Sequence, residues 1–207
     1  MPSRDYHEAL WSALPAAATP PDLELRSRFL LASVTPGQRV LDVGCGEGEL
    51  AARLQDAGAE VVAVDVAQVP LDRARARHPG LDLRLIDGEG HWDLPDASFD
   101  VVWAGEVIEH VADTAGWLSE ARRVLRPGGL LLLSTPAHGP LVRLWLALRP
   151  GAFAAHMHPL SDHLRFYERG GLSRLLEEFR FEGVRVRTAG RAPARASLLA
   201  SARRARF

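Results

Sequence analysis

The sequence predicts an α/β protein with a doubly wound, mostly parallel sheet and helices on both faces. Between residues 38 and 135, apolar runs of strand length alternate with segments long enough for helices. Strands that are apolar throughout are typical of parallel sheets covered on both faces. A turn with alternate glycines, Gly44-Cys45-Gly46-Glu47-Gly48, follows the first run. Such a turn between a strand and a helix presents unpaired backbone N–H groups to a ligand.

The pattern places each element in order along the chain. Residues 1–35 have helical periodicity that is broken at Pro15–Pro21. Pro127-Gly128-Gly129 is expected to separate a helix from the fifth strand. The tail from Arg191 is rich in alanine and arginine, and we expect a short basic helix, a disordered end or an edge element there. A seventh strand is not evident. The expected strands are 38–44, 60–65, 81–86, 98–104, 129–135 and 183–188, and the expected helices 48–57, 68–77, 114–125 and 170–180.

Bulk properties restrict the classes of function. A chain of 207 residues is long enough for one domain with a substantial core. No apolar run reaches the roughly 20 residues of a spanning helix, and no signal peptide is evident. The single cysteine, Cys45, favours a reducing cytoplasm. A net charge of −1 gives no broad reason to bind nucleic acid. Because all 25 basic residues are arginine, a lysine base or Schiff base is excluded.

A second carboxylate indicates a nucleoside site. Asp65 ends the second apolar run, 21 positions after Gly44, where it is placed to accept hydrogen bonds from ribose hydroxyls. The third glycine comes one position too early for a dinucleotide fingerprint. Glu47 and Glu49 also open the following helix, where they would repel a pyrophosphate. A cofactor that carries positive charge fits this turn better.

These residues resemble the first motif of the class I S-adenosylmethionine-dependent methyltransferases, an acidic residue followed by G-x-G-x-G. The resemblance continues in the family's order from about residue 38 to 136, through Asp65, Asp87-Gly88, Ser98–Ala104 and Leu125–Leu132. It implies S-adenosylmethionine as the cofactor, ribose binding by Asp65 and a loop beside the adenine at Asp87-Gly88. The cofactor-binding residues implied in this way are Asp42, Gly44, Cys45, Gly46, Asp65, Val66, Asp87, Gly88 and Glu106.

The resemblance also implies how the single domain is organised. Residues 1–35 would form a helical lid over the cofactor, and residues 36–136 the cofactor-binding core. Residues 137–168, which hold four of the eight histidines, are interpreted as a cap over the substrate. Residues 169–207 would supply a helix, a strand and the basic tail. In the lid, Arg26 or Arg28 could pair with the methionine carboxylate, although a solvated helix face is the simpler interpretation.

A chemical constellation follows the fourth strand at Glu106-Val107-Ile108-Glu109-His110. If this segment is helical, Glu106, Glu109 and His110 share one face and form half of a metal site, which His163 would complete. The pattern is similar to that of small-RNA 3′-terminal 2′-O-methyltransferases and of ubiquinone-pathway O-methyltransferases. The ion would be Mg²⁺ or Mn²⁺. The alternatives are that Glu106 orients the cofactor while His110 only packs or hydrogen-bonds, or that His110 is a metal-free base.

Histidines of the cap are candidates for removing a proton from the acceptor hydroxyl, because imidazole titrates near neutral pH. His163 ranks first because it precedes an apolar and aromatic run that should anchor it, and His158 ranks next. His156 belongs to the same group, whereas Tyr167 is interpreted as a packing residue. The candidate catalytic residues are therefore His163, His110 and His158.

The leading hypothesis is O-methylation of a hydroxyl on a small molecule. The run Leu141–Leu148 suggests a hydrophobic acceptor or a peripheral membrane contact, although an ordinary buried cap helix explains it more simply. Metal-assisted 2′-O-methylation of RNA is an alternative that the near-neutral charge argues against. The third hypothesis is a non-catalytic cofactor-binding partner subunit. The acceptor and the oligomeric state leave no recognisable pattern in the sequence.

Overall fold

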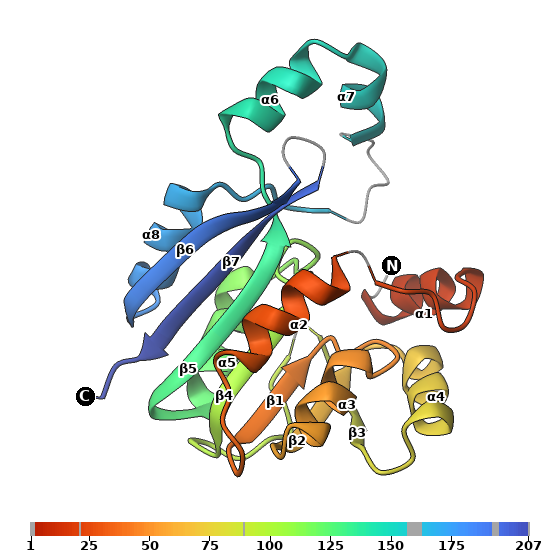
Figure 1. Cartoon of the computed structure of the whole chain (residues 1–207), viewed down its shortest axis with the longest axis vertical. Coiled ribbons are helices and arrows are strands. Elements are labelled where there is room, and N and C mark those ends of the chain that lie inside the picture. The colour runs from red at the N-terminus through yellow and green to blue at the C-terminus, as the bar shows by residue number, and fades with distance from the viewer. Residues whose placement is uncertain (1–2, 21, 89, 157–162, 192–194, 207) are drawn as a thin grey trace.

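The computed structural model describes residues 3–20, 22–88, 90–156, 163–191 and 195–206. They form a seven-stranded sheet in the order β3-β2-β1-β4-β5-β7-β6, with helices on both faces (Figure 1). The predicted doubly wound, mostly parallel α/β fold is confirmed. The strands are β1 (Arg39–Val43), β2 (Glu60–Asp65), β3 (Asp82–Leu85), β4 (Phe99–Gly105), β5 (Leu125–Pro136), β6 (Phe181–Arg191) and β7 (Arg195–Arg204). The helices are α1 (Ser3–Ala13), α2 (Leu23–Leu31), α3 (Glu49–Asp56), α4 (Gln68–Arg77), α5 (Thr114–Val124), α6 (Pro140–Ala147), α7 (Pro150–His156) and α8 (Arg169–Glu178).

Two apolar cores hold the helices on the sheet. In front of the sheet in Figure 1, α2 and α3 pack through Leu30 and Leu54 against Trp103 of β4. Behind it, α5 and α8 pack through residues such as Leu118 and Leu172 in the larger core. Burial of a leucine side chain contributes about 1.5–3 kcal/mol, so these contacts supply much of the stability of the layers.

The parallel strands end together, and this positions the site. Val43 of β1 is in register with Val64 of β2 and with Ala104 of β4. The residues just beyond these positions therefore gather at one edge of the sheet. In open α/β sheets this edge is where ligands bind. The glycine turn, Asp65 and Glu106 all lie there.

The helix-to-strand connection before β5 differs from the prediction. α5 ends at Val124 and β5 begins directly at Leu125, which pairs with Phe99. The pairing then shifts to Val101 with Leu130, so Pro127-Gly128-Gly129 forms an irregularity inside the strand rather than a break before it. Proline and glycine occur in strands mainly at such irregular positions, because proline lacks the donor that a regular ladder needs.

The prediction for the tail was wrong. Residues 195–204 form β7, which lies inside the sheet between β5 and β6 and is antiparallel to both. Ala196, Leu198, Ala200 and Ala202 alternate into the larger core. Alanine and arginine favour helices intrinsically, but burial of every second residue against β5 and β6 outweighs that preference. The expected strand at 183–188 is part of β6 at the sheet edge.

The hairpin formed by α6 and α7 projects from the body of the molecule beyond the ends of β5 and β7 (Figure 1). The interpretation of residues 141–148 as an ordinary buried helix was wrong for one face. Leu146 is buried, whereas Leu141, Leu144 and Leu148 are 68%, 56% and 73% exposed. Among the described residues, no helix combines the length and apolar character needed to cross a membrane.

Candidate functional site

The glycine turn is tied to the ends of β1 and β2. The backbone N–H groups of Gly44 and Cys45 donate to the carbonyl of Val64, at 2.8 and 3.0 Å. One carboxylate oxygen of Asp65 accepts from the N–H of Gly46 at 2.9 Å, and the other accepts from Ala67 at 3.0 Å. A carboxylate has about four acceptor sites, so Asp65 holds the turn and retains acceptor capacity for a ligand hydroxyl.

Two glycines of the turn are required by close approaches. Gly44 has a φ of +71°, and a Cβ there would collide with the side chain of Val107. Gly46 has a φ of +54°, and a Cβ there would lie 3.0 Å from the indole of Trp11. Side chains with a Cβ rarely adopt positive φ. The turn therefore keeps this conformation and its contacts with Val107 and Trp11 only while both positions lack a side chain.

Buried charges surround the turn. Asp42 is 2% exposed, and burial, reinforced by the nearby Asp65, raises its pKa to about 7 in spite of Arg26. Burial also raises the pKa of Asp65, while backbone hydrogen bonds oppose the shift. Burial is also the main cause of the raised pKa of the Cys45 thiol, which keeps the thiol protonated. Two buried carboxylates close together favour a ligand that brings positive charge.

Arg26 is buried, contrary to the solvated helix face that we expected. Its residue is 5% exposed, whereas Arg28 on the same helix is exposed. The positive charge of Arg26 acts on both Asp42 and Glu106, where it partly opposes the rise in pKa that burial causes. A guanidinium has the geometry to bind a ligand carboxylate through two parallel hydrogen bonds.

The N-terminal segment is docked over the turn by polar contacts. Glu8 of α1 accepts hydrogen bonds from the N–H groups of Gln68 and Val69, at 2.5 and 3.0 Å, and so caps α4. Arg4 donates to the carbonyls of Val66 and Ile86, both at 3.2 Å. A capping carboxylate stabilises a helix start because it satisfies unpaired N–H groups and opposes the helix dipole. Residues 3–13 are thereby held beside the ends of β2 and β3.

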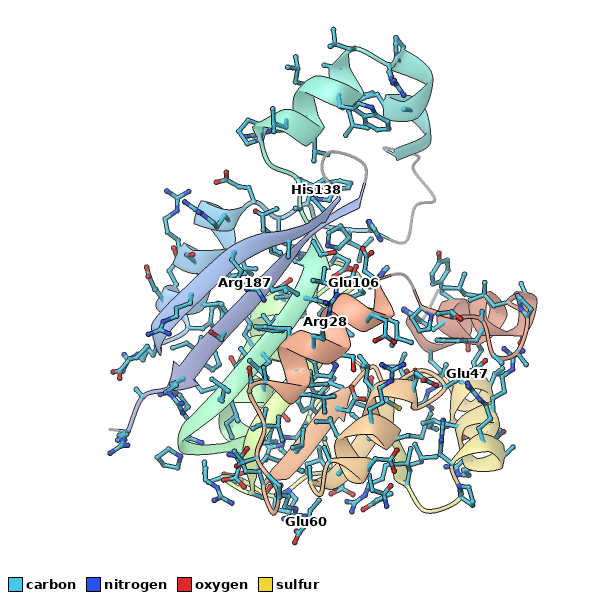
Figure 2. The ribbon with its side chains drawn as sticks, in the orientation of Figure 1. Arg28, Glu47, Glu60, Glu106, His138 and Arg187 are labelled. Atoms are coloured by element: carbon cyan, nitrogen blue, oxygen red, sulfur yellow. The ribbon has the colours of Figure 1, made fainter. Side chains whose placement is uncertain are left out.

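Glu47 has a different environment from the one that we inferred from the sequence. α3 begins at Glu49, and Glu47 lies before it, buried, with ion pairs to Arg73 and Arg77 at 3.3 and 3.0 Å. It also accepts a hydrogen bond from the N–H of Ala17 at 2.8 Å. Glu47 therefore joins the N-terminal segment to α4, which Figure 2 shows on the same side of the molecule.

Two adjoining cavities occupy this edge of the sheet. The larger, of about 820 Å³, is lined by residues that include Asp42, Cys45, Gly46, Arg26 and His163. The smaller, of about 190 Å³, is lined by residues that include Asp65, Val66, Ile86, Gly88 and Trp92. Trp11, Gly44, Glu106 and His110 line both. Asp87, which the resemblance placed beside the adenine, is exposed and lines neither cavity.

The segment Glu106–His110 is a turn and not the helix on which the shared face was based. Glu106 has a φ of +60°, a conformation that costs a residue with a side chain of order 1–3 kcal/mol and is common at functional sites. Its carboxylate accepts a hydrogen bond from the hydroxyl of Ser134 at 2.7 Å. Burial raises the pKa of Glu106. Glu106 lies at the carboxyl ends of the strands, beside α2 (Figure 2).

His163 is brought beside this turn by backbone hydrogen bonds. The N–H groups of Leu164 and Arg165 donate to the carbonyl of Glu109, at 2.8 and 3.2 Å. The guanidinium of Arg165 donates to the carbonyls of Val111 and Ala112. The buried Tyr167 donates to the carbonyl of Ile108 at 3.4 Å. His163 is therefore anchored by the backbone of Leu164 and by Arg165 and Tyr167, rather than by apolar burial of Leu164 and Phe166, which are 52% and 38% exposed.

Three of the four predicted metal ligands come together. One ligand atom from each of Glu109, His110 and His163 lies within 4.8 Å of the others. The rings of His110 and His163 are 4.9 Å apart between centroids. Glu109 is 1% exposed and also accepts from the hydroxyl of Thr135 at 2.9 Å. The structure does not bring Glu106 into this group, because its carboxylate is directed to Ser134.

Two imidazoles and one carboxylate fit a first-row transition ion such as Mn²⁺ better than Mg²⁺, which prefers oxygen ligands.

The remaining predicted residues have different outcomes. His158 lies outside the described residues, and His156 ends α7. The described residues of α6 and α7 line neither cavity, whereas His163, at the end of the predicted cap, does.

Sequence reasoning missed two residues of α1 that line the site. Trp11 lies over Gly46, and His7 lines the smaller cavity with its ring 6.4 Å from that of His110. Both come from a segment more than 30 residues before the glycine turn. The helical periodicity of residues 1–35 and the resemblance predicted a helical lid, but no local pattern indicated which of its side chains line the site.

Comparisons with known proteins agree with this fold. Residues 41–133 match the family model described as "Methyltransferase domain". A protein of Mycolicibacterium smegmatis named "Probable S-adenosylmethionine-dependent methyltransferase" is 39% identical over 153 residues, which cover 73% of this chain and 55% of the relative. A ubiquinone biosynthesis O-methyltransferase of Cereibacter sphaeroides is 43% identical over 110 residues, which cover 50% of this chain and 43% of the relative. The chain thus spans about half the length of these curated relatives.

A solved structure has the same fold. The crystal structure of an S-adenosylmethionine-dependent methyltransferase from Archaeoglobus fulgidus has a TM-score of 0.69 to this chain. The superposition covers 88% of this chain and 93% of the other, at 16% sequence identity. The likeness concerns the arrangement of the sheet and helices, and it extends beyond the residues that match the family model.

Proposed function

We propose that this protein transfers a methyl group from S-adenosylmethionine to a hydroxyl of a small molecule. Residues 41–133 match the model of the methyltransferase domain family, and a relative of this chain is named a probable S-adenosylmethionine-dependent methyltransferase. The observation that carries the proposal is the pair of adjoining cavities that share Gly44, Glu106 and His110. One cavity has the chemistry of a nucleoside site, and the other has room for an acceptor.

The nucleoside half of the cofactor fits the smaller cavity. Asp65 offers its carboxylate to the ribose hydroxyls, and Val66, Ile86 and Gly88 provide apolar walls for the adenine. The methionine half would extend past Gly44 into the larger cavity. There Arg26 complements the carboxylate, and Asp42 and Glu106 complement the amino group and the sulfonium charge. The buried acids thus account for the preference for a cationic cofactor.

The acceptor would bind in the larger cavity, with its hydroxyl near His110 and His163. Transfer itself needs the oxygen, the methyl group and the sulfur in line, and the walls of the cavity supply that alignment. An imidazole that takes the hydroxyl proton typically contributes ~10²–10⁴-fold to such a step. The oxygen forms the new C–O bond, the sulfur keeps the electron pair of the broken C–S bond, and the proton goes to the imidazole. The name of the Cereibacter relative, an O-methyltransferase, supports oxygen as the acceptor atom.

A divalent metal is the second part of the proposal. Glu109, His110 and His163 would hold it, and their donor atoms favour Mn²⁺ over Mg²⁺. When bound there, such an ion would lower the pKa of an acceptor hydroxyl. Without a metal, the same histidines remain candidates for the base, and the buried Glu109 would orient His110, whose Nε2 lies 3.8 Å from its carboxylate.

The cofactor is tested by calorimetry with S-adenosylmethionine. Wild type should bind it, and Asp65→Ala should lose about tenfold or more in affinity, since a hydrogen bond to a charged group contributes about 1.5–3 kcal/mol. Asp72→Ala, which removes an exposed acid of α4, is the matched control. Absence of binding by wild type would refute the proposal.

The acceptor and the metal are tested with a labelled methyl donor. The panel holds phenols, catechols, sugars, lipids and an RNA with a terminal 2′-hydroxyl, each with and without chelator. Label on oxygen supports the proposal, whereas label only on nitrogen or carbon, or none at all, would overturn it. Binding of Mn²⁺, followed by electron paramagnetic resonance, should be lost in His163→Ala. Equal binding by wild type and variant would rule out the metal site.

The lone cysteine leads us to propose the cytoplasm as the compartment.

A further inference from the structure

The hairpin of α6 and α7 carries apolar side chains on two opposite faces. On one face, Val142 is half-buried and Leu146 is 7% exposed. On α6, Leu141, Leu144 and Leu148 are spaced i, i+3 and i+7, so they form one stripe, and all three are more than half exposed. A helix that is apolar all round is normally covered on all sides. The outer stripe therefore calls for a covering surface.

No element of the described chain supplies that surface. Among the described helices and strands, α6 packs extensively only on α7. α7 adds a further exposed side chain, Phe153, at 49%. The hairpin also stands away from the sheet in Figure 1, and the described residues of both helices lie outside the linings of the two cavities. The stripe consequently faces outward and does not close the active site.

The charge of the hairpin indicates what covers it. From Ala137 to Ser161 the sequence holds no aspartate or glutamate, but it holds Arg143 and Arg149. Both arginines are exposed, and the guanidinium of Arg149 lies 5.1 Å from the ring centre of Trp145. Leucine and phenylalanine bordered by arginine and tryptophan is the composition of helices that lie in the interface of an anionic membrane. The rest of the chain differs, since the protein as a whole has a net charge of −1.

We propose that the α6–α7 hairpin docks on the surface of an anionic lipid membrane, with Leu141, Leu144, Leu148 and Phe153 entering the boundary between headgroups and acyl chains. Arg143 and Arg149 would then contact lipid phosphates. The helices are too short to span a bilayer, so the contact is peripheral and reversible. It would hold the open edge of the sheet close to the membrane, and it does not depend on the methyl-transfer proposal.

The test is co-sedimentation of the whole protein with vesicles. Wild type should bind vesicles that contain phosphatidylglycerol, and it should bind pure phosphatidylcholine more weakly. The double variant Leu141→Glu with Leu148→Glu should lose on the order of 100-fold in partitioning, about tenfold per leucine. Leu85→Glu places the same substitution at an exposed leucine on β3, at the far end of the sheet, and should bind as wild type does.

The arginines are tested separately. Arg143→Gln with Arg149→Gln should remove most of the preference for anionic vesicles, about fivefold per arginine, while binding to phosphatidylcholine stays unchanged. Absence of vesicle binding by wild type, or equal binding by the leucine variant, would overturn the proposal. A stable dimer in light scattering that the leucine substitutions dissociate would also overturn it, because a second copy would then cover the stripe. Cofactor calorimetry on the same samples reports on the methyltransferase site independently.

Discussion

Replacement of Asp42 by asparagine should make the protein more stable, and the gain should grow with pH. Asp42 is 2% exposed, and its Oδ2 has no hydrogen-bond partner among the described residues. Burial and the neighbouring Asp65 raise its pKa to about 7, and only Arg26 opposes them. A charged carboxylate at this position is therefore costly to the empty protein. The neutral amide has the same shape without that cost.

The sign and the size follow from the two pKa values. In the unfolded chain the group has a pKa of 3.8, and in the folded chain about 7. Between these values the folded state binds more protons than the unfolded state, so stability falls as pH rises. At 1.36 kcal/mol per unit of pKa, the penalty is about 2 kcal/mol at pH 5 and about 4 kcal/mol above pH 7. Below pH 4 it vanishes.

Urea unfolding of wild type and Asp42→Asn between pH 5 and 8.5 measures this penalty directly. The difference in free energy of unfolding should increase by about 2 kcal/mol across that range, because titrating groups that do not interact with Asp42 contribute equally to both proteins. Asp72→Asn, at an exposed acid paired with Arg75, should give a difference that does not change with pH. A flat difference for Asp42→Asn, or one that shrinks toward high pH, would refute the account of the buried charge.

Three further predictions concern the cofactor site. Gly46→Ala should displace Trp11 and weaken S-adenosylmethionine binding in calorimetry. Gly37 also has a positive φ, but a Cβ there would have no atom within 4 Å, so Gly37→Ala should lower stability without changing affinity. Equal affinities of the two variants would contradict the Trp11 contact. Glu8→Gln should weaken the docking of α1 on α4 by about 1 kcal/mol, so limited proteolysis within α1 should become faster. Asp5→Asn, at an exposed acid of α1, is the control. Unchanged cleavage of Glu8→Gln would show that the contacts of Glu8 with α4 do not hold the helix. Arg26→Gln should lower the affinity for S-adenosylmethionine about tenfold. The affinity for 5′-methylthioadenosine should stay unchanged, because this compound lacks the amino-acid part. Equal losses for both compounds would show that Arg26 does not bind the methionine carboxylate.

The parts of the site that sequence reasoning located are those that a short stretch of chain encodes. The glycine turn, Asp65 and the strand that precedes Glu106 lie within the alternating core, where periodicity and turn residues report directly on structure. Asp65 accepts from the N–H of Gly46, 19 residues earlier. That contact follows from two parallel neighbouring strands ending at the same edge, which the βαβ pattern already implies.

The errors arose where distant segments meet. The sequence alone did not reveal that the carboxylate of Glu106 is directed to Ser134 and away from Glu109 and His110. The reason is that residues 106–110 form a turn in which Glu106 has a left-handed backbone conformation, and not the helix that we expected. It also gave no sign that residues 195–204 would be drawn into the sheet between β5 and β6, since their composition favours a helix. In both places contacts across the fold outweighed local preference.

The amino-acid sequence by itself determined the α/β class, the succession of the first five strands along the chain and the position of the glycine turn, because each depends on residues close together in the chain. Only the tertiary structure decided that Glu106 stays out of the group formed by Glu109, His110 and His163, that Trp11 and Arg26 line the larger cavity, and that the described residues leave one face of α6 uncovered. These features depend on packing and hydrogen bonds between segments tens of residues apart. No local sequence pattern reports the energies of these long-range contacts, because the contacts form only when the sheet brings the segments together.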